Sequence, residues 1–332
     1  MKLHRNIKIF INYFLGPLLF IWLSWSIYRQ IMNQPDLSLA WDKVKASFAG
    51  PASWYLVCTF LLVFINWSVE AVKWKLCISK VQNVSFARSF KAVLSGVSFS
   101  VSTPNRIGEY LGRVLYMDEG NRLKTISLTI VGSLSQLLIT LVMGCAGWIM
   151  LRPLILDRGL ISPLWANMIL WGIIVVILVL TLFYFRLPWL VKWFGKIPAA
   201  RRFTYLVEVL QEFNATLLFK LLSLSVLRFG VFIIQYFLLF RLFGVDLTGE
   251  ETLWTVSVSF LVMAVIPTIT LLELVQRGKV VATVVGIYSA NELGMNLATA
   301  GIWFLNLILP AIIGSLLILR LRKIITVKNK KT

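Results

Sequence analysis

The chain has 332 residues, of which 58% are hydrophobic and only 14% are charged, and its mean hydropathy is +0.82. Apolar runs that approach or exceed the roughly 20 residues needed to cross a bilayer as a helix recur along the chain, and they exclude a soluble protein. These runs are too long and too uniform for the alternating strands of an outer-membrane barrel. We therefore expect an all-α polytopic membrane protein.

The formal net charge of +19 does not indicate a nucleic-acid-binding protein, because the chain has no soluble domain that would bind nucleic acid. Basic residues that flank membrane spans instead report orientation and attraction to anionic headgroups. The three cysteines lie singly in or beside apolar runs, and the single histidine, His4, lies in the basic N-terminus. We expect no metal site, no cofactor and no catalytic residues.

Residues 7–28 form the first predicted span. A signal peptide begins in the same way, but this apolar part is long and lacks a clear cleavage site, so we keep it as a helix. Residues 33–50 are polar and fit an outer loop, and residues 54–74 form the second span. Glu70 and Lys73 lie near its basic end, and we interpret them as an interfacial ion pair.

The next apolar segment is too short to cross the membrane. Residues 92–102 rise only about 16 Å as a helix, roughly half of a ~30 Å hydrocarbon core, before Pro104 interrupts them. Residues 107–117 resume an amphipathic helix, and basic residues lie on both sides of the unit. We predict a re-entrant hairpin that enters and leaves on the cytoplasmic side and is covered by protein or water.

This hairpin carries an unusual set of charges for a membrane segment. The spacing of Arg106, Glu109 and Arg113 places them on one helical face. Gly108 and Gly112 form a small-xxx-small pair that allows another helix to approach closely. Charged side chains in a membrane are costly and usually mark a site or a pathway. The alternative is a cytoplasmic loop beside a membrane helix.

Residues 126–150 and 164–185 form the next two predicted spans. Residues 186–220 mix basic and apolar residues, which is typical of a cytoplasmic linker with an amphipathic helix on the membrane surface. Residues 221–240 follow as a further span.

Residues 252–266 are a second short apolar segment, broken at Pro267, and residues 271–285 follow it. Residues 295–319 form the last predicted span, before a basic tail. The distribution of basic clusters places both termini in the cytoplasm.

The two broken segments match each other. Residues 84–104 and 247–267 share the same length and order, and each proline is followed by a glutamate with an arginine four residues later. The first unit starts from the basic side and the second from the acidic side, so their orientations are opposite. Inverted repeats with paired broken helices point to a transporter's midplane site. Coincidence is the alternative, because this glutamate–arginine spacing is common in helices.

Residues 102–110 (STPNRIGEY) and 266–278 (IPTITLLELVQRG) resemble the two signature segments of the lysylphosphatidylglycerol synthase transmembrane-region family. That family contains the lipid-flippase half of bifunctional synthase/flippase proteins and many stand-alone relatives. The resemblance covers residues 54–319. Synthase activity is not implied, because no aminoacyl-transferring domain follows residue 319.

By this resemblance, the motif positions in this chain are Pro104, Arg106, Gly108, Glu109, Arg113, Pro267, Thr268, Glu273, Arg277 and Gly278. Val275 and Gln276 depart from the pattern, since relatives tend to have a glycine before the arginine segment. This difference would alter the packing of the second hairpin.

The predicted function is a lipid flippase that moves an anionic phospholipid or a polyprenyl-phosphate-type lipid through a cavity between the hairpins. Guanidinium groups suit phosphate oxygens, and the glutamates would hold the arginines or contact an amine on the lipid. The predicted substrate-binding residues are Arg106, Glu109, Arg113, Glu273, Arg277, Thr103, Thr268, Arg228 and Gln235. The predicted hinge residues are Pro104, Gly108, Gly112, Pro267 and Gly278. The alternative for each Glu/Arg pair is a salt bridge that only pins its hairpin.

Two other functions stay open at this point. A membrane-embedded transferase acting on a lipid-linked substrate would need a base, and Glu109 is a candidate, although its neighbouring arginines favour its ionised form. An accessory membrane subunit would instead position a partner by its basic surface.

We expect a single integral membrane domain over residues 1–332 in the bacterial cytoplasmic (inner) membrane. Its predicted parts are the first helix and outer loop (1–51), repeat 1 (52–151), a connecting helix and linker (152–218), repeat 2 (219–320) and a basic tail (321–332). Membrane lipid with an anionic headgroup is the expected partner. A homodimer and a separate lipid-modifying enzyme are compatible with the sequence.

Overall fold

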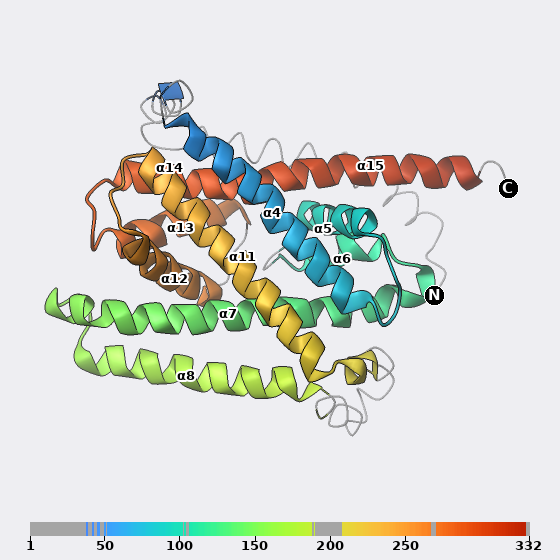
Figure 1. Cartoon of the computed structure of the whole chain (residues 1–332), viewed down its shortest axis with the longest axis horizontal. Coiled ribbons are helices and arrows are strands. Elements are labelled where there is room, and N and C mark those ends of the chain that lie inside the picture. Colours follow the sequence, from blue (N-terminus) through green and yellow to red (C-terminus); the bar gives the residue numbers. More distant parts are fainter. Residues whose placement is uncertain are drawn as a thin grey trace.

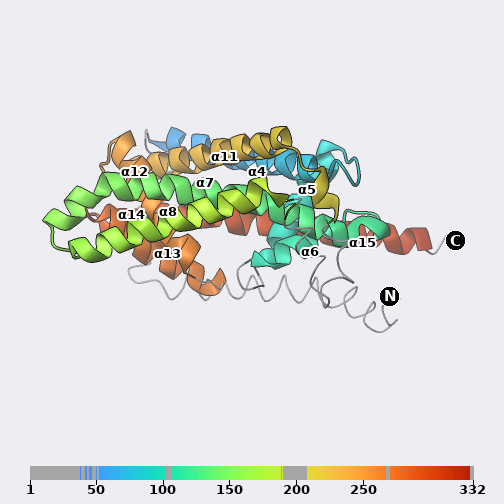
Figure 2. The ribbon, with the colours of Figure 1, turned by 90° about the horizontal axis from the view of Figure 1, so that it is seen from below.

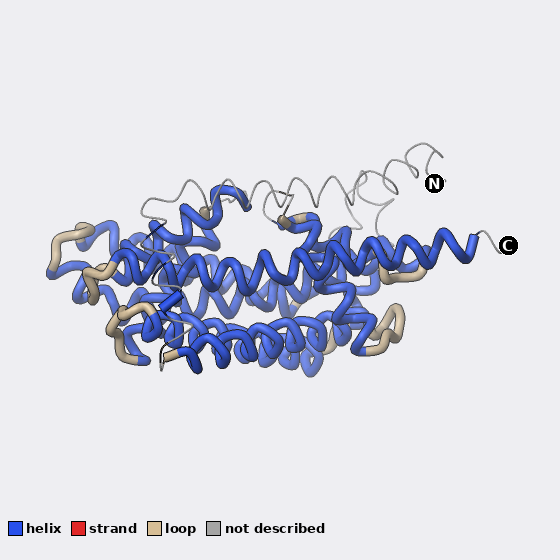
Figure 3. Tube along the Cα trace, turned by 90° about the horizontal axis from the view of Figure 1, so that it is seen from above, coloured by secondary structure: helices blue, strands red, loops and turns tan. Residues whose placement is uncertain are grey.

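The computed structural model describes residues 52–101, 103, 106–187, 189, 208–266 and 270–329, together with the isolated residues 38, 42, 45, 46 and 50. Within these ranges every regular element is helical (Figure 1), which confirms the expected all-α fold. Most of the described loops lie at the two ends of the helix bundle (Figure 3). The long helices therefore run from one end of the bundle to the other, as membrane spans do.

Five helices in the described part are long and apolar enough to cross a membrane. They are α4 (Ser53–Ile78), α7 (Arg122–Asp157), α8 (Pro163–Phe185), α11 (Ala215–Leu242) and a last composite span, Glu292–Leu319. These five match five of the six predicted spans. The remaining one, residues 7–28, lies outside the described residues.

Two pairs of shorter helices occupy the predicted broken segments. The first pair is α5 (Phe86–Ser100) and α6 (Gly108–Val114), and the second is α12 (Gly249–Val265) and α13 (Thr270–Val285). α5 begins earlier than predicted because the Ser85 side chain accepts a hydrogen bond from the Arg88 N–H at 3.2 Å and so caps the helix. Its 15 residues rise about 22 Å, still short of a ~30 Å hydrocarbon core.

The two short pairs lie at opposite ends of the bundle, with α5 and α6 at one end and α12 and α13 at the other (Figures 1 and 2). Between them α4 packs against α11, and the two run in opposite directions (Figure 1). α5 packs against α15 (Leu309–Asn329), which follows the second pair, and α12 packs against α7, which follows the first. This reciprocal packing agrees with the predicted repeat, whose boundaries stay a prediction.

Glycines bring α5 into close contact with helices on two sides. A Cβ atom on Gly108 would lie 2.2 Å from the Phe99 carbonyl oxygen, and one on Gly112 would lie 2.4 Å from the Ser95 carbonyl oxygen. On the other side, a Cβ atom on Gly314 of α15 would lie 2.0 Å from the Leu94 carbonyl oxygen. Small residues allow such contacts between membrane helices, so α5 is held between α6 and α15.

The last span is not a uniform α-helix. α14 (Glu292–Trp303) passes into a π-helical turn, η6 (Phe304–Ile308), and then into α15. Pro310 lies just beyond this turn and has no N–H to donate to the carbonyl of Asn306, which interrupts the regular pattern. The Leu309 N–H instead donates to the Phe304 carbonyl, five residues earlier. The π-turn therefore lies where Pro310 prevents a regular α-helix.

We expect Gly112→Ala to destabilise the protein, because the added methyl group would overlap the α5 backbone. Overpacking of this kind costs roughly 1–3 kcal/mol, and thermal denaturation of the purified protein would measure it. Gly172→Ala is the matched control, because no atom lies within 4 Å of a Cβ atom at that helical position. An unchanged denaturation midpoint for Gly112→Ala would contradict the packing described here.

Candidate functional site

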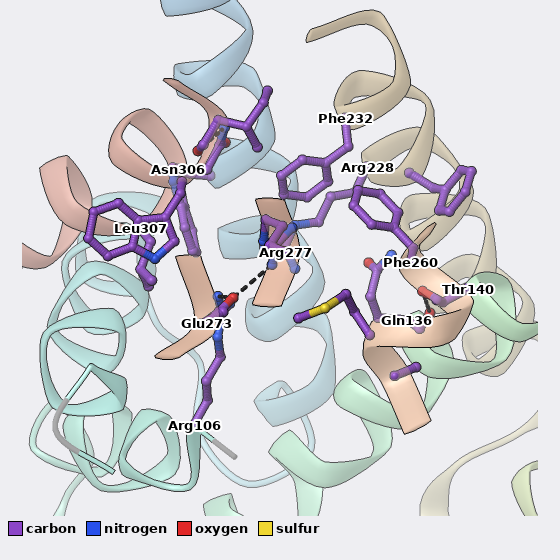
Figure 4. Close-up of a pocket in the computed structure, with 16 residues that line it drawn as sticks. Arg106, Gln136, Thr140, Arg228, Phe232, Phe260, Glu273, Arg277, Asn306 and Leu307 are labelled. Carbon is purple, nitrogen blue, oxygen red and sulfur yellow. Dashed lines mark hydrogen bonds and ion pairs between the residues drawn. The ribbon is translucent and has the colours of Figure 1, made fainter. Parts of the chain in front are cut away.

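A cavity of about 290 Å³ lies between the two short helix pairs and the long helices (Figure 4). Its polar wall consists of Arg106, Gln136, Thr140, Arg228, Glu273, Arg277 and Asn306. Its aromatic wall consists of Trp67, Phe229, Phe232, Phe260 and Trp303. Three arginines and a glutamate around one cavity are unusual inside a membrane protein, where buried charge is costly.

Glu273 connects the two broken units at this cavity. Its Oε1 atom accepts hydrogen bonds from Arg106 Nη2 and from Arg277 Nη2, each at 2.7 Å (Figure 4). The pair with Arg277 is the predicted contact four residues apart, whereas Arg106 comes from the entrance to α6. Glu273 is only 3% exposed, while the Arg106 side chain is 39% exposed. Arg106 therefore lies at the mouth of the cavity and Glu273 inside it.

Arg106 has a left-handed backbone, with φ at +58°, and it is the one non-glycine residue with positive φ in the described part of the chain. This conformation costs an L-residue roughly 1–2 kcal/mol. Strained residues of this kind persist where surrounding contacts hold them, and they cluster at functional sites. The ion pair with Glu273 is one such contact.

A second layer of buried charge lies behind the cavity, around Glu70 of α4. Glu70 Oε1 accepts from Arg113 Nη2 at 2.8 Å, and Glu70 Oε2 accepts from Lys73 Nζ at 2.9 Å and from Arg228 Nη1 at 2.8 Å. Arg113 also forms the predicted pair with Glu109. The prediction of a Glu70–Lys73 pair is confirmed, and the structure adds that both side chains are buried among the helices, with Glu70 5% exposed and Lys73 1% exposed. Partners from α6 and α11 cover them.

A chain of buried amide groups holds Arg228 from its other side. Arg228 Nε donates to Asn66 Oδ1 at 2.9 Å, and Asn66 Nδ2 donates to Asn306 Oδ1 at 2.9 Å. Asn306 Nδ2 donates to Gln235 Oε1 at 3.1 Å, and Gln235 Nε2 donates to the Thr59 carbonyl oxygen at 3.2 Å. A guanidinium can only donate and a carbonyl can only accept. The two ends therefore fix the orientation of all three amides.

The π-turn belongs to this arrangement, because Asn306 lies within it and also lines the cavity. π-turns occur frequently at functional sites. Arg228 in turn lies over two aromatic rings, with its Cζ atom 5.2 Å from the centroid of Trp67 and 5.7 Å from that of Phe232. Cation–π attraction adds to the hydrogen bonds that hold its guanidinium in place.

The structure brings four of the predicted substrate-binding residues to the cavity: Arg106, Arg228, Glu273 and Arg277. Glu109 and Arg113 lie instead in the layer behind it, and Gln235 belongs to the amide chain. Thr103 is a cap, since its Oγ1 atom accepts from the Gly108 N–H at 2.7 Å. Thr268 lies outside the described residues.

Among the predicted hinge residues, Gly108 and Gly112 contact α5, and a Cβ atom on Gly278 would lie 2.9 Å from Asn296 Oδ1. Pro104 and Pro267 lie outside the described residues. Asn66 and Asn306 are site residues that the sequence analysis missed. Both are amides inside long apolar runs, and that polarity is the signal by which they could have been found.

The fold and the cavity together define a polytopic helical membrane protein with a charged site between two broken helical units. Residues 13–314 match the sequence profile of the lysylphosphatidylglycerol synthase TM region. The chain therefore belongs to this family, as the two signature segments indicated, and a membrane lipid-related function follows from that membership. Comparisons with curated proteins and with solved structures gave no match.

The backbone of Arg106 gives a paired prediction. Arg106→Ala and Arg106→Gly both remove the ion pair with Glu273, but only glycine adopts positive φ without steric cost. We expect the glycine variant to be more stable than the alanine variant by about 1 kcal/mol, as measured by denaturation of the two purified proteins. Equal stability would show that the left-handed conformation carries no strain.

The direction of the amide chain gives a second prediction. Asn306→Asp replaces a donor by an acceptor that faces Gln235 Oε1, and leaving a buried group unpaired costs roughly 1–3 kcal/mol. We expect a lower thermal midpoint for this variant. Asn296→Asp on the same composite helix is the control, because Asn296 is exposed. An equal drop in the thermal midpoint for both variants would contradict the donor and acceptor directions given above for the buried amides.

Proposed function

We propose that the protein is a flippase that carries a lipid with an anionic headgroup, either a phospholipid or a polyprenyl-phosphate-type lipid, across the membrane through this cavity. The observation that carries the proposal is the Arg106–Glu273 ion pair, which joins the two broken units directly at the cavity. Arg228 and Arg277 lie beside it. Membership of a family that contains lipid-flippase domains supports the same function.

An incoming phosphate group would compete with Glu273 for the same guanidinium groups. Arginine forms strong charge-assisted hydrogen bonds with phosphate oxygens as well as with carboxylates. When Arg106 turns from Glu273 to the headgroup, the direct link between the two helix pairs is lost. The pairs are then free to separate on one side or the other, which is the step that alternating access requires.

We propose transport rather than group transfer. A transferase would need a base at the lipid headgroup, and the carboxylate that lines the cavity, Glu273, has one oxygen held by two arginines. Glu109, the base considered from the sequence, pairs with Arg113 in the layer behind the cavity. Placement in the bacterial cytoplasmic membrane, with both termini in the cytoplasm, is part of the proposal and rests on the basic clusters at the predicted cytoplasmic ends.

The test is translocation of a fluorescent anionic lipid in vesicles that contain the purified full-length protein. We expect wild-type vesicles to move the headgroup faster than empty vesicles, and Arg228→Gln to lower the rate about tenfold or more, because a charge-assisted hydrogen bond to the headgroup is lost. Thermal denaturation of the variant would verify that it is folded.

Arg241→Gln is the matched control, because Arg241 lies on the same helix and pairs at 3.6 Å with Asp246, whose side chain is 88% exposed. Its rate should equal that of the wild type. The proposal fails if wild-type and empty vesicles give equal rates for several anionic lipids. It also fails if the two arginine variants lose activity equally.

A further inference from the structure

We propose that the headgroup bound in this cavity is a phosphomonoester, in preference to a phosphodiester or an amine-bearing headgroup. This inference rests on the proposed function and names the substrate class of the same site. The charge balance of the cavity, the unpaired polar atoms on its wall and the apolar residues at its rim support it in turn.

Positive charge exceeds negative charge by two over the two ion-pair layers. The two layers together contain five cations and three carboxylates, namely Lys73, Arg106, Arg113, Arg228 and Arg277 with Glu70, Glu109 and Glu273. A phosphomonoester carries about −1.5 to −2 at neutral pH, which matches this excess. A phosphodiester carries a single negative charge, and a zwitterionic headgroup would leave the whole excess uncompensated in a low-dielectric region.

Three buried polar atoms on cavity-lining side chains have no hydrogen-bond partner among the described residues. Two are donors, Trp67 Nε1 and Trp303 Nε1, and one is an acceptor, Glu273 Oε2. Trp67 and Trp303 are each 5% exposed, and Glu273 is 3% exposed. Unpaired buried donors are costly, so a ligand that accepts hydrogen bonds from the two indoles after small side-chain shifts is favoured.

A phosphomonoester has the matching set of groups. Its terminal phosphate has three non-bridging oxygens, which would accept hydrogen bonds from the arginines and the indole N–H groups of the wall. A phosphodiester has two non-bridging oxygens. An ammonium group could reach only the carboxylate of Glu273, and Arg106 and Arg277 already lie against that carboxylate and would repel it.

The rim of the cavity favours a lipid over a soluble phosphate. Ala264 lines the cavity, and the next two residues, Val265 and Ile266, are 73% and 37% exposed. On the opposite unit Arg106 is followed by Ile107, which is 56% exposed. A cavity of about 290 Å³ holds a headgroup but no acyl chain, so the chains would pass over these apolar side chains into the bilayer.

The experiment measures displacement of a fluorescent phosphatidic acid from the wild-type protein in detergent. The competitors are dioleoyl phosphatidic acid, dioleoyl phosphatidylglycerol, dioleoyl phosphatidylethanolamine and glycerol 3-phosphate. We expect phosphatidic acid to compete about tenfold or more better than phosphatidylglycerol, as one additional charge-assisted hydrogen bond would give. Phosphatidylethanolamine and glycerol 3-phosphate should compete more weakly still.

Two variants locate this preference in the cavity. Arg106→Gln and Trp303→Phe should each reduce the ratio between phosphatidic acid and phosphatidylglycerol, because the first removes the positive charge and the second removes the indole N–H. Trp148→Phe is the control for the indole, since Trp148 Nε1 donates to the Ala166 carbonyl, on α8, at 3.3 Å. Its ratio should equal that of the wild type, and a ratio that changes as in Trp303→Phe would overturn the assignment.

Equal competition by phosphatidic acid and phosphatidylglycerol, or by phosphatidic acid and phosphatidylethanolamine, would overturn the phosphomonoester preference. Glycerol 3-phosphate that competes as well as phosphatidic acid would overturn the choice of a lipid. Preferential binding without any translocation would sink the flippase proposal and leave the headgroup preference intact. Translocation with equal affinity for phosphatidic acid and phosphatidylglycerol would overturn the headgroup preference and leave the flippase proposal intact.

Discussion

The architecture depends on the ion pairs made by the buried carboxylate of Glu70. It accepts hydrogen bonds from Lys73 on its own helix, from Arg113 on α6 and from Arg228 on α11. Breaking a buried pair by removal of one partner costs roughly 3–5 kcal/mol, because a charge is then stranded in a low dielectric. These three helices are therefore fixed relative to one another. Since Arg228 also lines the cavity, the rigid framework and the proposed substrate site share one guanidinium.

The two ion-pair layers differ in how tightly they are held. The inner layer around Glu70 joins buried groups, whereas Arg106 in the outer layer is more than a third exposed and sits on a strained backbone. The outer link between the two broken units is therefore the weaker one. A molecule built in this way keeps α4, α6 and α11 together while the contact between α13 and the entrance to α6 opens and closes. The reciprocal packing of α5 on α15 and of α12 on α7 would carry such a motion to both halves.

Hydropathy and helix punctuation were enough to predict the five spans of the described residues, the two broken units and both glutamate–arginine pairs four residues apart. They were not enough to predict which charges meet across the bundle. Arg106 pairs with Glu273, 167 positions away, and Asn66 pairs with Asn306, 240 positions away. Local spacing identifies partners within one helix, whereas partners on different helices are chosen by the close approach of backbones at glycines and by the π-turn. For the same reason Glu70 could be predicted to pair with Lys73 but not to lie at the centre of a buried cluster.

The π-turn at residues 304–308 has a consequence for the register of the last span. One extra residue in a turn rotates everything beyond it by about 100° relative to a continuous α-helix. α14 packs against α13 and α11, and α15 packs against α5, so one polypeptide segment presents two differently oriented faces to the two halves. Deletion of a single residue there would turn Gly314 away from Leu94 and place a larger side chain against α5. The number of residues in this segment therefore cannot change by even one, although most of its side chains are apolar and could be replaced by other apolar side chains.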